Sequence, residues 1–119
     1  AGIQWETIQP EKIKVFAFEE FQGKKRWELA EYITTQWPDR NKYHVPGIEY
    51  WKYIFENPAK APDSLKNGNW YFFFGSIFRN SDGYWDVPSA SWDGSEFERD
   101  GNWLGGGWHS VDRVVLVEK

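Results

Sequence analysis

The sequence predicts a single α+β domain, and three observations lead to that fold class. The chain has 119 residues, which is enough for one domain with its own core. A strand pattern near the N-terminus is followed by two segments with helical periodicity, and strand patterns return in the second half. Elements grouped in this order are typical of α+β folds, whereas α/β folds alternate strands and helices. We therefore expect one domain over residues 1–119.

The two ends of the chain are predicted to form paired strands. Residues 13–17 place Ile13, Val15 and Ala17 on one face, with the period of two that a strand requires. Residues 113–118 (RVVLVE) form a short apolar strand at the other end of the sequence. An apolar terminal strand must pair with a neighbour, and the N-terminal strand is the simplest partner. We expect the two helices to pack on a small antiparallel sheet that contains this pair.

Two helices are predicted between these strands. The first covers residues 24–37 and ends before Pro38, and the second covers residues 46–57 and ends at the Asn57-Pro58 pair. Pro46 suits a first helical position, where its missing N–H costs no hydrogen bond. Apolar residues at three- to four-residue spacing predict the buried faces. They are Trp27, Ala30, Ile33 and Trp37 in the first helix, and Ile48, Trp51, Ile54 and Phe55 in the second.

The second half of the chain begins with its most apolar segment. Residues 69–78, which include Trp70 and five further aromatic residues, predict a central strand that is covered on both faces. Residues 80–83 (NSDG) predict a tight turn, and residues 84–88 a returning strand. Residues 89–112 are rich in Gly, Ser and Asp, so we expect them to be mostly loops.

Composition excludes several classes of function. The absence of Cys rules out disulfides, thiolate zinc sites and cysteine nucleophiles, and His44 and His109 are too few for a multi-histidine metal centre. A net charge of −4 disfavours nucleic-acid binding, which needs a basic face. No apolar run approaches the ~20 residues that span a bilayer, and no signal peptide is recognisable, so we expect no membrane insertion. We also expect no cofactor.

Catalytic patterns are also weak, and we expect no enzymatic activity. Ser110, His109 and Asp112 are adjacent, whereas a catalytic triad needs side chains that converge from separate positions. No pair stands out among the acids that a glycosidase could use, and residues 80–86 lack a calcium-loop pattern. Residues 105–107 (GGG) lack the Lys-Ser/Thr of a phosphate loop. The acids in question are Asp93, Glu96, Glu98 and Asp100.

The C-terminal part is rich in tryptophan and contains four short motifs, at residues 87–95 (VPSASWDGS), 102–104 (NWL), 108–110 (WHS) and 113–116 (RVVL). In these motifs it resembles the variable region of target proteins of diversity-generating retroelements. Residues 27–30, 46–51 and 70–75 resemble shorter, cysteine-free members of that group. It implies a C-type lectin fold, related to the phage tropism determinant and to formylglycine-generating enzyme. Residues 79–112 would be the variable, ligand-binding region, on a virion or cell surface. The motifs by which lectins bind sugar through calcium are missing, since Trp92-Asp93-Gly94 matches only in part.

In such systems errors at template adenines vary the target gene, and codons decide which residues can change. Trp codons contain no adenine, so Trp85, Trp92, Trp103 and Trp108 would be an invariant, mostly buried scaffold. Mutated Asn codons give mainly small and polar residues, never Glu, Lys or Trp. The positions that fit this set, and that we expect on one exposed face, are Ser89, Ser91, Asp93, Asp100, Gly101, Gly105, Gly106, Gly107, His109, Val111 and Asp112. Turn-rich loops have a similar composition without any diversification.

Three functions therefore remain open at the level of sequence. The first is a non-catalytic display domain that binds an unknown protein or cell-surface ligand through exchangeable loop residues on a rigid aromatic frame. The second is a divergent domain of the formylglycine-generating type or a glycan-cleaving enzyme, against which the missing Cys and acid pair argue. The third is a carbohydrate-binding module that stacks sugars on exposed Trp rings.

Overall fold

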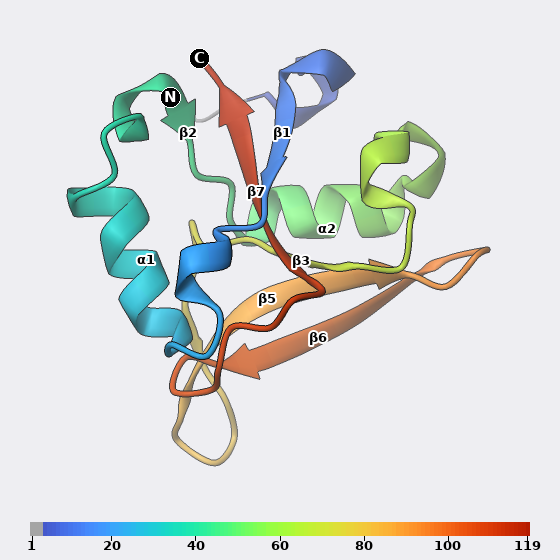
Figure 1. Cartoon of the computed structure of the whole chain (residues 1–119). Coiled ribbons are helices and arrows are strands. Elements are labelled where there is room, and N and C mark those ends of the chain that lie inside the picture. The colour runs from blue at the N-terminus through green and yellow to red at the C-terminus, as the bar shows by residue number, and fades with distance from the viewer. Residues whose placement is uncertain (1–3) are drawn as a thin grey trace.

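A computed structural model describes residues 4–119 as an α+β fold with a mixed sheet, which confirms the predicted fold class (Figure 1). Short 3-10 turns connect several of the elements. The helices are α1 (Arg26–Thr35) and α2 (Ile48–Glu56). The strands are β1 (Ile13–Phe16), β2 (Tyr43–His44), β3 (Trp70–Phe72), β4 (Phe78–Arg79), β5 (Trp85–Trp92), β6 (Phe97–Trp103) and β7 (Asp112–Glu118).

The terminal strands pair as predicted. β1 and β7 are antiparallel, with Ile13 opposite Val117 and Phe16 opposite Val114. The expectation of an antiparallel sheet is wrong, however, because β3 runs parallel to β7 on the other edge of that strand. The chain reverses direction twice between β3 and β7, through β5 and β6, so that β7 returns in the direction of β3. The main path through the sheet is β1-β7-β3-β5-β4, with β2 beside β7 and β6 beside β5.

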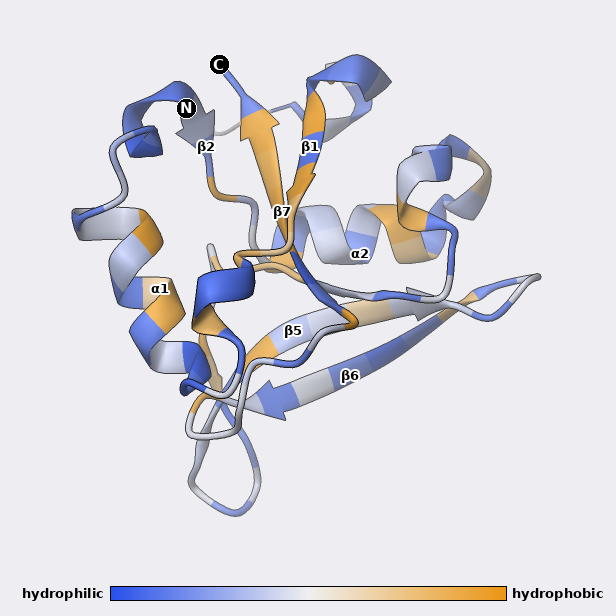
Figure 2. Ribbon diagram, in the orientation of Figure 1, coloured by the Kyte–Doolittle hydropathy of each residue, from blue (hydrophilic) through white to orange (hydrophobic). Residues whose placement is uncertain are grey.

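The sheet separates two apolar cores, and the alternation of side chains along β3 and β7 supplies both. Tyr71 and Val115 belong to the core that includes Ile54 of α2. Their neighbours Phe72 and Val114 belong to the core on the opposite face, which includes Leu29 and Ile33 of α1. The two helices thus cover opposite faces of the sheet, and β7 is apolar along most of its length (Figure 2).

The prediction that residues 89–112 are mostly loops is wrong. β5 extends to Trp92 and forms a regular antiparallel hairpin with β6, from the pair Asp86–Trp103 to the pair Trp92–Phe97. The central part of β5 pairs with β3 on one edge and with β6 on the other. Backbone pairing on two sides outweighs the low strand propensity of the Ser, Asp and Gly residues in this segment. Only residues 93–96 and 104–111 lie outside the strands.

The helices are shorter than predicted and their buried faces are rotated. In α1, Arg26, Leu29 and Ile33 are buried, whereas Trp27 was expected in the core and is instead 47% exposed. In α2, Tyr50 and Ile54 are the buried residues. The other predicted core residues of α2, Ile48, Trp51 and Phe55, are half-buried. In α1 the charged Arg26 takes the buried position of the first turn in place of Trp27, which apolar periodicity could not predict.

Candidate ligand-binding surface

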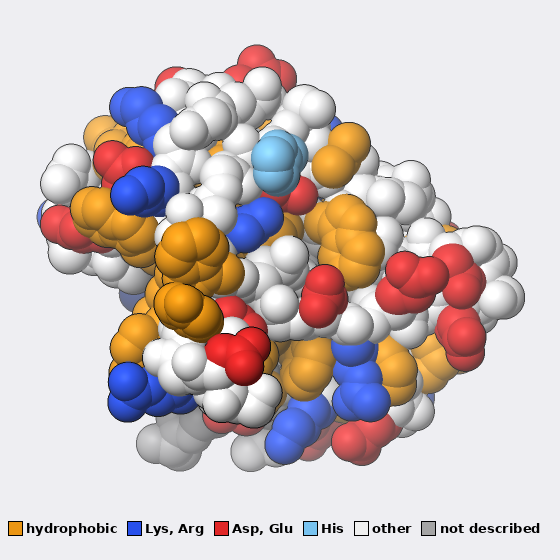
Figure 3. Space-filling model, turned by 90° about the horizontal axis from the view of Figure 1, so that it is seen from below, with side chains coloured by type: hydrophobic (Ala, Val, Ile, Leu, Met, Phe, Trp, Pro, Cys, Tyr) orange, Lys and Arg blue, Asp and Glu red, His pale blue; other side chains and the backbone are white. Residues whose placement is uncertain are grey.

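Large apolar side chains gather at one place on the surface. Six large hydrophobic residues are exposed among those described, and five of them line a single groove with a volume of about 690 Å³. Figure 3 shows apolar side chains grouped on the face seen from below. We call this site the aromatic groove. Its five exposed residues are Trp27, Ile77, Tyr84, Trp85 and Trp103, and Lys25, Gly83, Leu104 and Gly105 complete its lining.

The groove lies where four segments of the chain are hydrogen-bonded to one another. The side-chain oxygen of Asn80 accepts hydrogen bonds from the backbone N–H groups of Asp82 and Tyr84, which fixes the turn before β5. The N–H of Leu104 donates to the Trp85 carbonyl at 2.9 Å, and the N–H of Trp27 donates to the Leu104 carbonyl at 3.0 Å. Leu104 therefore joins the start of α1 to the open end of the β5–β6 hairpin. The exposed rings stand on a backbone that is held in place.

The rings of the groove also contact one another and one cation. The Tyr84 and Trp103 rings meet edge to face, with centroids 5.7 Å apart. The guanidinium of Arg79 lies 5.4 Å from the centroid of the Trp85 ring. Trp85 and Trp103 remain 50% and 52% exposed in spite of these contacts. The groove therefore offers large apolar area with few torsions left to fix on binding.

A buried arginine is hydrogen-bonded to the backbone at the end of the groove. Arg26 is 8% exposed, its guanidinium lies 5.3 Å from the Phe72 ring centroid, and its Nη1 donates to the Trp103 carbonyl at 2.9 Å. Its backbone N–H donates to the Gly106 carbonyl. Burial lowers the pKa of Arg26 from its ordinary value, with partial compensation from nearby carboxylates. Its Nε has no hydrogen-bond partner among residues 4–119.

Acidic residues surround Arg26 without forming a close ion pair with it. Asp112 is buried, and Oδ2 accepts a hydrogen bond from the His109 backbone N–H at 2.9 Å. Burial raises the pKa of Asp112, against the opposing effects of that hydrogen bond and of Arg26. Asp86, also buried, accepts a hydrogen bond from the Asn80 side-chain amide at 3.1 Å. Through this bond the Asp112 carboxylate fixes the backbone of the loop that carries His109.

Three of the residues predicted on an exposed face are buried, so that prediction is wrong for Ser89, Ser91 and Asp112. The Ser89 hydroxyl is hydrogen-bonded to the side-chain oxygen of Asn102, and the Ser91 hydroxyl donates to the Gly68 carbonyl at 3.2 Å. Both serines lie on β5, which is enclosed by strands on each edge. Their small polar side chains suit a tightly packed interior where each hydroxyl has a partner.

Three of the predicted glycines have no room for a side chain. A Cβ on Gly101 would lie 2.6 Å from the Phe78 ring, one on Gly105 2.4 Å from the Trp103 ring, and one on Gly106 2.3 Å from Nη1 of Arg26. A Cβ on Gly107 would have its nearest neighbour at 4.0 Å. Of the four glycines proposed as exchangeable, only Gly107 therefore tolerates substitution without movement of its surroundings.

Asp93 is exposed but is separated from the other predicted positions. Its carboxylate accepts hydrogen bonds from the backbone N–H groups of Ser95 and Glu96, both at 2.9 Å, which closes the hairpin turn and lowers the pKa of Asp93. Six strand positions separate this turn from Trp103, a span of about 20 Å at ~3.3 Å per residue. Four predicted positions remain that are exposed or open and lie away from that turn. They are Asp100, Gly107, His109 and Val111.

The four predicted scaffold tryptophans differ in burial. Trp108 is 1% exposed, and its indole N–H donates to the Ala17 carbonyl at 2.8 Å, so its predicted core position is confirmed. Trp92 is half-buried against Phe97. Trp85 and Trp103 lie on β5 and β6 at the open end of the hairpin. Both are exposed, so the prediction that they are buried is wrong. The pair Tyr84-Trp85 directly after a tight turn was the available sequence signal for an exposed aromatic site.

Metal-binding clusters and membrane-spanning helices are not found in the described part of the chain. Within residues 4–119, no group of three His, Asp and Glu side chains is arranged to hold a metal ion. None of the helices there has the length and apolar character needed to cross a membrane. In comparisons with known proteins, the chain matches no family model, no curated protein and no solved structure. The aromatic groove is therefore the feature from which a function can be proposed.

Proposed function

We propose that this domain is a non-catalytic recognition module that binds an apolar segment of a partner protein in the aromatic groove. The observation that carries the proposal is the convergence of five exposed large hydrophobic residues on one groove. Contiguous apolar surface of this kind typically marks an interaction site, whereas scattered exposed apolar residues need no explanation. Trp, Tyr and Arg, which dominate binding energy at protein interfaces, all occur here, as Trp85, Tyr84 and Arg79.

The charges at the groove indicate the character of that segment. Lys25 is the one charged residue in the groove lining, and Arg79 stacks on the Trp85 ring. The protein as a whole carries a net charge of −4, so these cations are a local departure from its average. A partner segment with apolar side chains and an acidic residue would complement them.

We further propose a C-type lectin-like fold within the group of retroelement-diversified binding proteins that the sequence resembles, displayed on a virion or cell surface. The paired terminal strands and the two helices support the fold proposal. Diversification would be confined to positions that tolerate change. Three of these, Asp100, Gly107 and His109, lie near Arg26 or on its neighbouring loop. Contact with the ligand would then come mainly from the groove rings and less from the small residues.

A random peptide library displayed on phage tests the binding proposal. We expect selection on the folded domain to enrich apolar peptides with an acidic residue. Trp103→Ala and Trp85→Ala should each weaken the Kd of a synthetic selected peptide by about 30-fold, as a ~2 kcal/mol contact would. Trp5→Ala, a half-buried Trp outside the groove, should leave the Kd unchanged. Selected peptides that bind both groove variants as tightly as the parent would contradict the proposal.

Carbohydrate binding is the second candidate function, because one specific feature of the groove favours it. The Trp103 ring packs directly on Gly105 and is 52% exposed, which leaves ring surface on which a sugar could stack. A glycan array probed with the parent and with Trp103→Ala separates the candidates. Glycan signals that disappear in the variant, together with failed peptide selection, would favour the carbohydrate function.

A further inference from the structure

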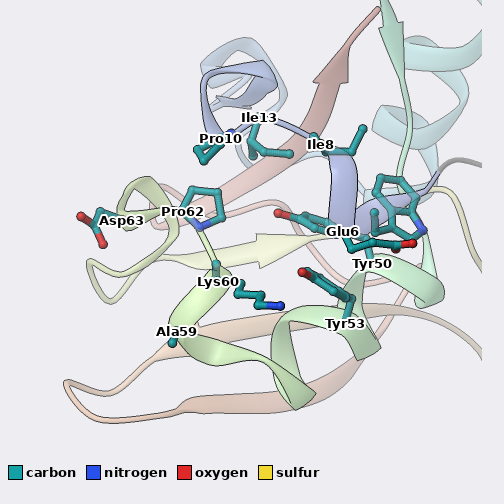
Figure 4. A pocket seen from close by; sticks show the side chains of 12 residues that line it. Glu6, Ile8, Pro10, Ile13, Tyr50, Tyr53, Ala59, Lys60, Pro62 and Asp63 are labelled. Carbon is teal, nitrogen blue, oxygen red and sulfur yellow. The ribbon is translucent and has the colours of Figure 1, made fainter.

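A second cavity lies away from the aromatic groove, between the N-terminal segment and α2. Its volume is about 420 Å³, within the ~300–1,000 Å³ range of small-molecule sites. Residues 5–13 form one wall, and α2 with residues 59–63 forms the other (Figure 4). It shares no lining residue with the aromatic groove, so it is a separate site.

Two tyrosine hydroxyls of this cavity have no hydrogen-bond partner among residues 4–119. Tyr50 is 3% exposed, with its ring against Trp5 at a centroid distance of 4.9 Å and near the Tyr53 ring at 6.2 Å. Among the hydrogen bonds of residues 4–119, none involves the Tyr50 or Tyr53 hydroxyl, whereas Tyr71 bonds both Ser64 and Asn67. Neither hydroxyl oxygen is among the buried unpaired atoms of residues 4–119, so both are open to the cavity and free to bond a ligand atom there.

The polar groups directed into the cavity are hydrogen-bond donors. The Tyr53 hydroxyl and the Lys60 ammonium point toward the same space in Figure 4, while the carboxylates of Glu6 and Asp63 point away from it. Burial raises the pKa of Tyr50 above its ordinary value, which already lies well above neutral pH. Two hydroxyls and one cation favour an anionic acceptor.

Another part of the wall is apolar. Ile8, Pro10, Ile13 and Pro62 line it, and Ile13 is itself buried. A ligand here needs one anionic end and a hydrocarbon part. We propose that the cavity binds a small carboxylic acid, with the carboxylate oxygens accepting hydrogen bonds from Tyr50, Tyr53 and Lys60 and the hydrocarbon part against Ile8, Pro10 and Pro62.

Sodium hexanoate is the probe that tests this site, with neutral hexanamide as its matched control. Backbone amide shifts of the ¹⁵N-labelled domain, followed up to about 10 mM ligand, report where and how tightly each compound binds. We expect hexanoate to shift residues of the cavity wall and hexanamide to bind at least 10-fold more weakly. Lys60→Met and Tyr53→Phe should each weaken hexanoate binding about 5-fold or more, and Lys52→Met on the exposed side of α2 should not.

Several outcomes would overturn the proposal. Equal binding of hexanoate and hexanamide would show that the donors do not select an anion. Unchanged affinity in both Lys60→Met and Tyr53→Phe would exclude these side chains from the site. An absence of shifts at the cavity wall with hexanoate would exclude the ligand class. Lys60 is exposed, so its replacement leaves the core intact and the test does not depend on a destabilised variant. None of these results bears on peptide binding in the aromatic groove.

Discussion

Arg26 Nη1 donates a hydrogen bond to the carbonyl oxygen of Trp103 across 2.9 Å, which links the first turn of α1 to the last residue of β6. Trp27, the next residue in α1, and Trp103 both line the aromatic groove. The contact therefore sets the relative position of two groove tryptophans. A buried guanidinium at this point connects core packing to the shape of the proposed binding surface.

Replacement of Arg26 should destabilise the domain and disturb the groove together. Arg26→Met removes the charged donor of the Trp103 carbonyl, which keeps only the Gly106 backbone N–H, and a hydrogen bond from a charged group contributes about 1.5–3 kcal/mol. Urea unfolding followed by circular dichroism measures this loss. The exposed control Lys24→Met should change stability by less than ~0.5 kcal/mol. Equal stability of Arg26→Met and Lys24→Met would show that the hydrogen bond has no structural role.

Truncation of Trp108 and of Trp103 should have very different effects on stability. Trp108 is buried and bonded to Ala17, so Trp108→Ala should lower the free energy of unfolding by roughly 3–5 kcal/mol. Trp103 is half exposed, so Trp103→Ala should cost about 1 kcal/mol or less. Thermal melting of the two variants compares them directly. A Trp103→Ala variant as unstable as Trp108→Ala would place Trp103 in the core and remove it from the binding surface.

Gly106 and Gly107 form a matched pair of substitutions for the proposed variable loop. A Cβ on Gly106 would overlap Nη1 of Arg26, whereas one on Gly107 meets nothing closer than 4.0 Å. Gly106→Ala should therefore destabilise the domain by about 1–3 kcal/mol, and Gly107→Ala should be nearly neutral. Denaturant midpoints of the two variants give the comparison. Neutral behaviour of both would mean that the loop is free to vary throughout, as the sequence alone suggests.

The two aspartates with opposite pKa shifts should affect the pH dependence of stability with opposite signs. Burial raises the pKa of Asp112, so its ionisation favours the unfolded state, and its contribution to stability falls as pH rises from 3.8 through the folded-state pKa. Stability of Asp112→Asn relative to the parent should therefore rise between about pH 3 and pH 7. For Asp93, hydrogen bonds lower the pKa, so ionisation of this residue favours the folded state. The stability of Asp93→Asn relative to the parent should therefore fall as pH rises over the same range.

Urea unfolding at each pH measures both differences. Asn retains an oxygen that can accept the backbone hydrogen bonds of either site, so each variant changes mainly the titration. Parallel pH profiles for the two variants would contradict the assigned environments of Asp112 and Asp93.

The parts of the fold that sequence predicts correctly are those with strong local patterns. Alternation in residues 13–17 and the apolar run in 113–118 predicted β1, β7 and their pairing. The turn at residues 80–83 was also predicted, and Gly83 adopts a positive φ of 87° there. These features depend on residues that are close in sequence or that carry an unmistakable apolar pattern.

The parts that sequence could not predict depend on tertiary neighbours. Ser89 and Ser91 are of a residue type that is common in loops, yet strands on both edges of β5 make them part of the sheet interior. Trp27 and Trp103 are of a residue type that is usually buried, yet the first turn of α1 and the end of β6 leave them exposed. The buried position of Arg26 has no sequence signal, because a charged residue at a helix start is ordinarily solvated. The candidate site therefore emerged only from the arrangement in space.

The most direct test of the central claim is the response of the tryptophan indole N–H signals to a peptide selected on the folded domain. Trp27, Trp85 and Trp103 line the aromatic groove, whereas the indoles of Trp51 and Trp108 donate to the Ser89 and Ala17 carbonyls. In a ¹H–¹⁵N correlation spectrum, binding in the groove should shift the first three signals and leave those of Trp51 and Trp108 in place. Saturable binding that moves none of the three groove signals would contradict the assignment of the aromatic groove as the recognition surface.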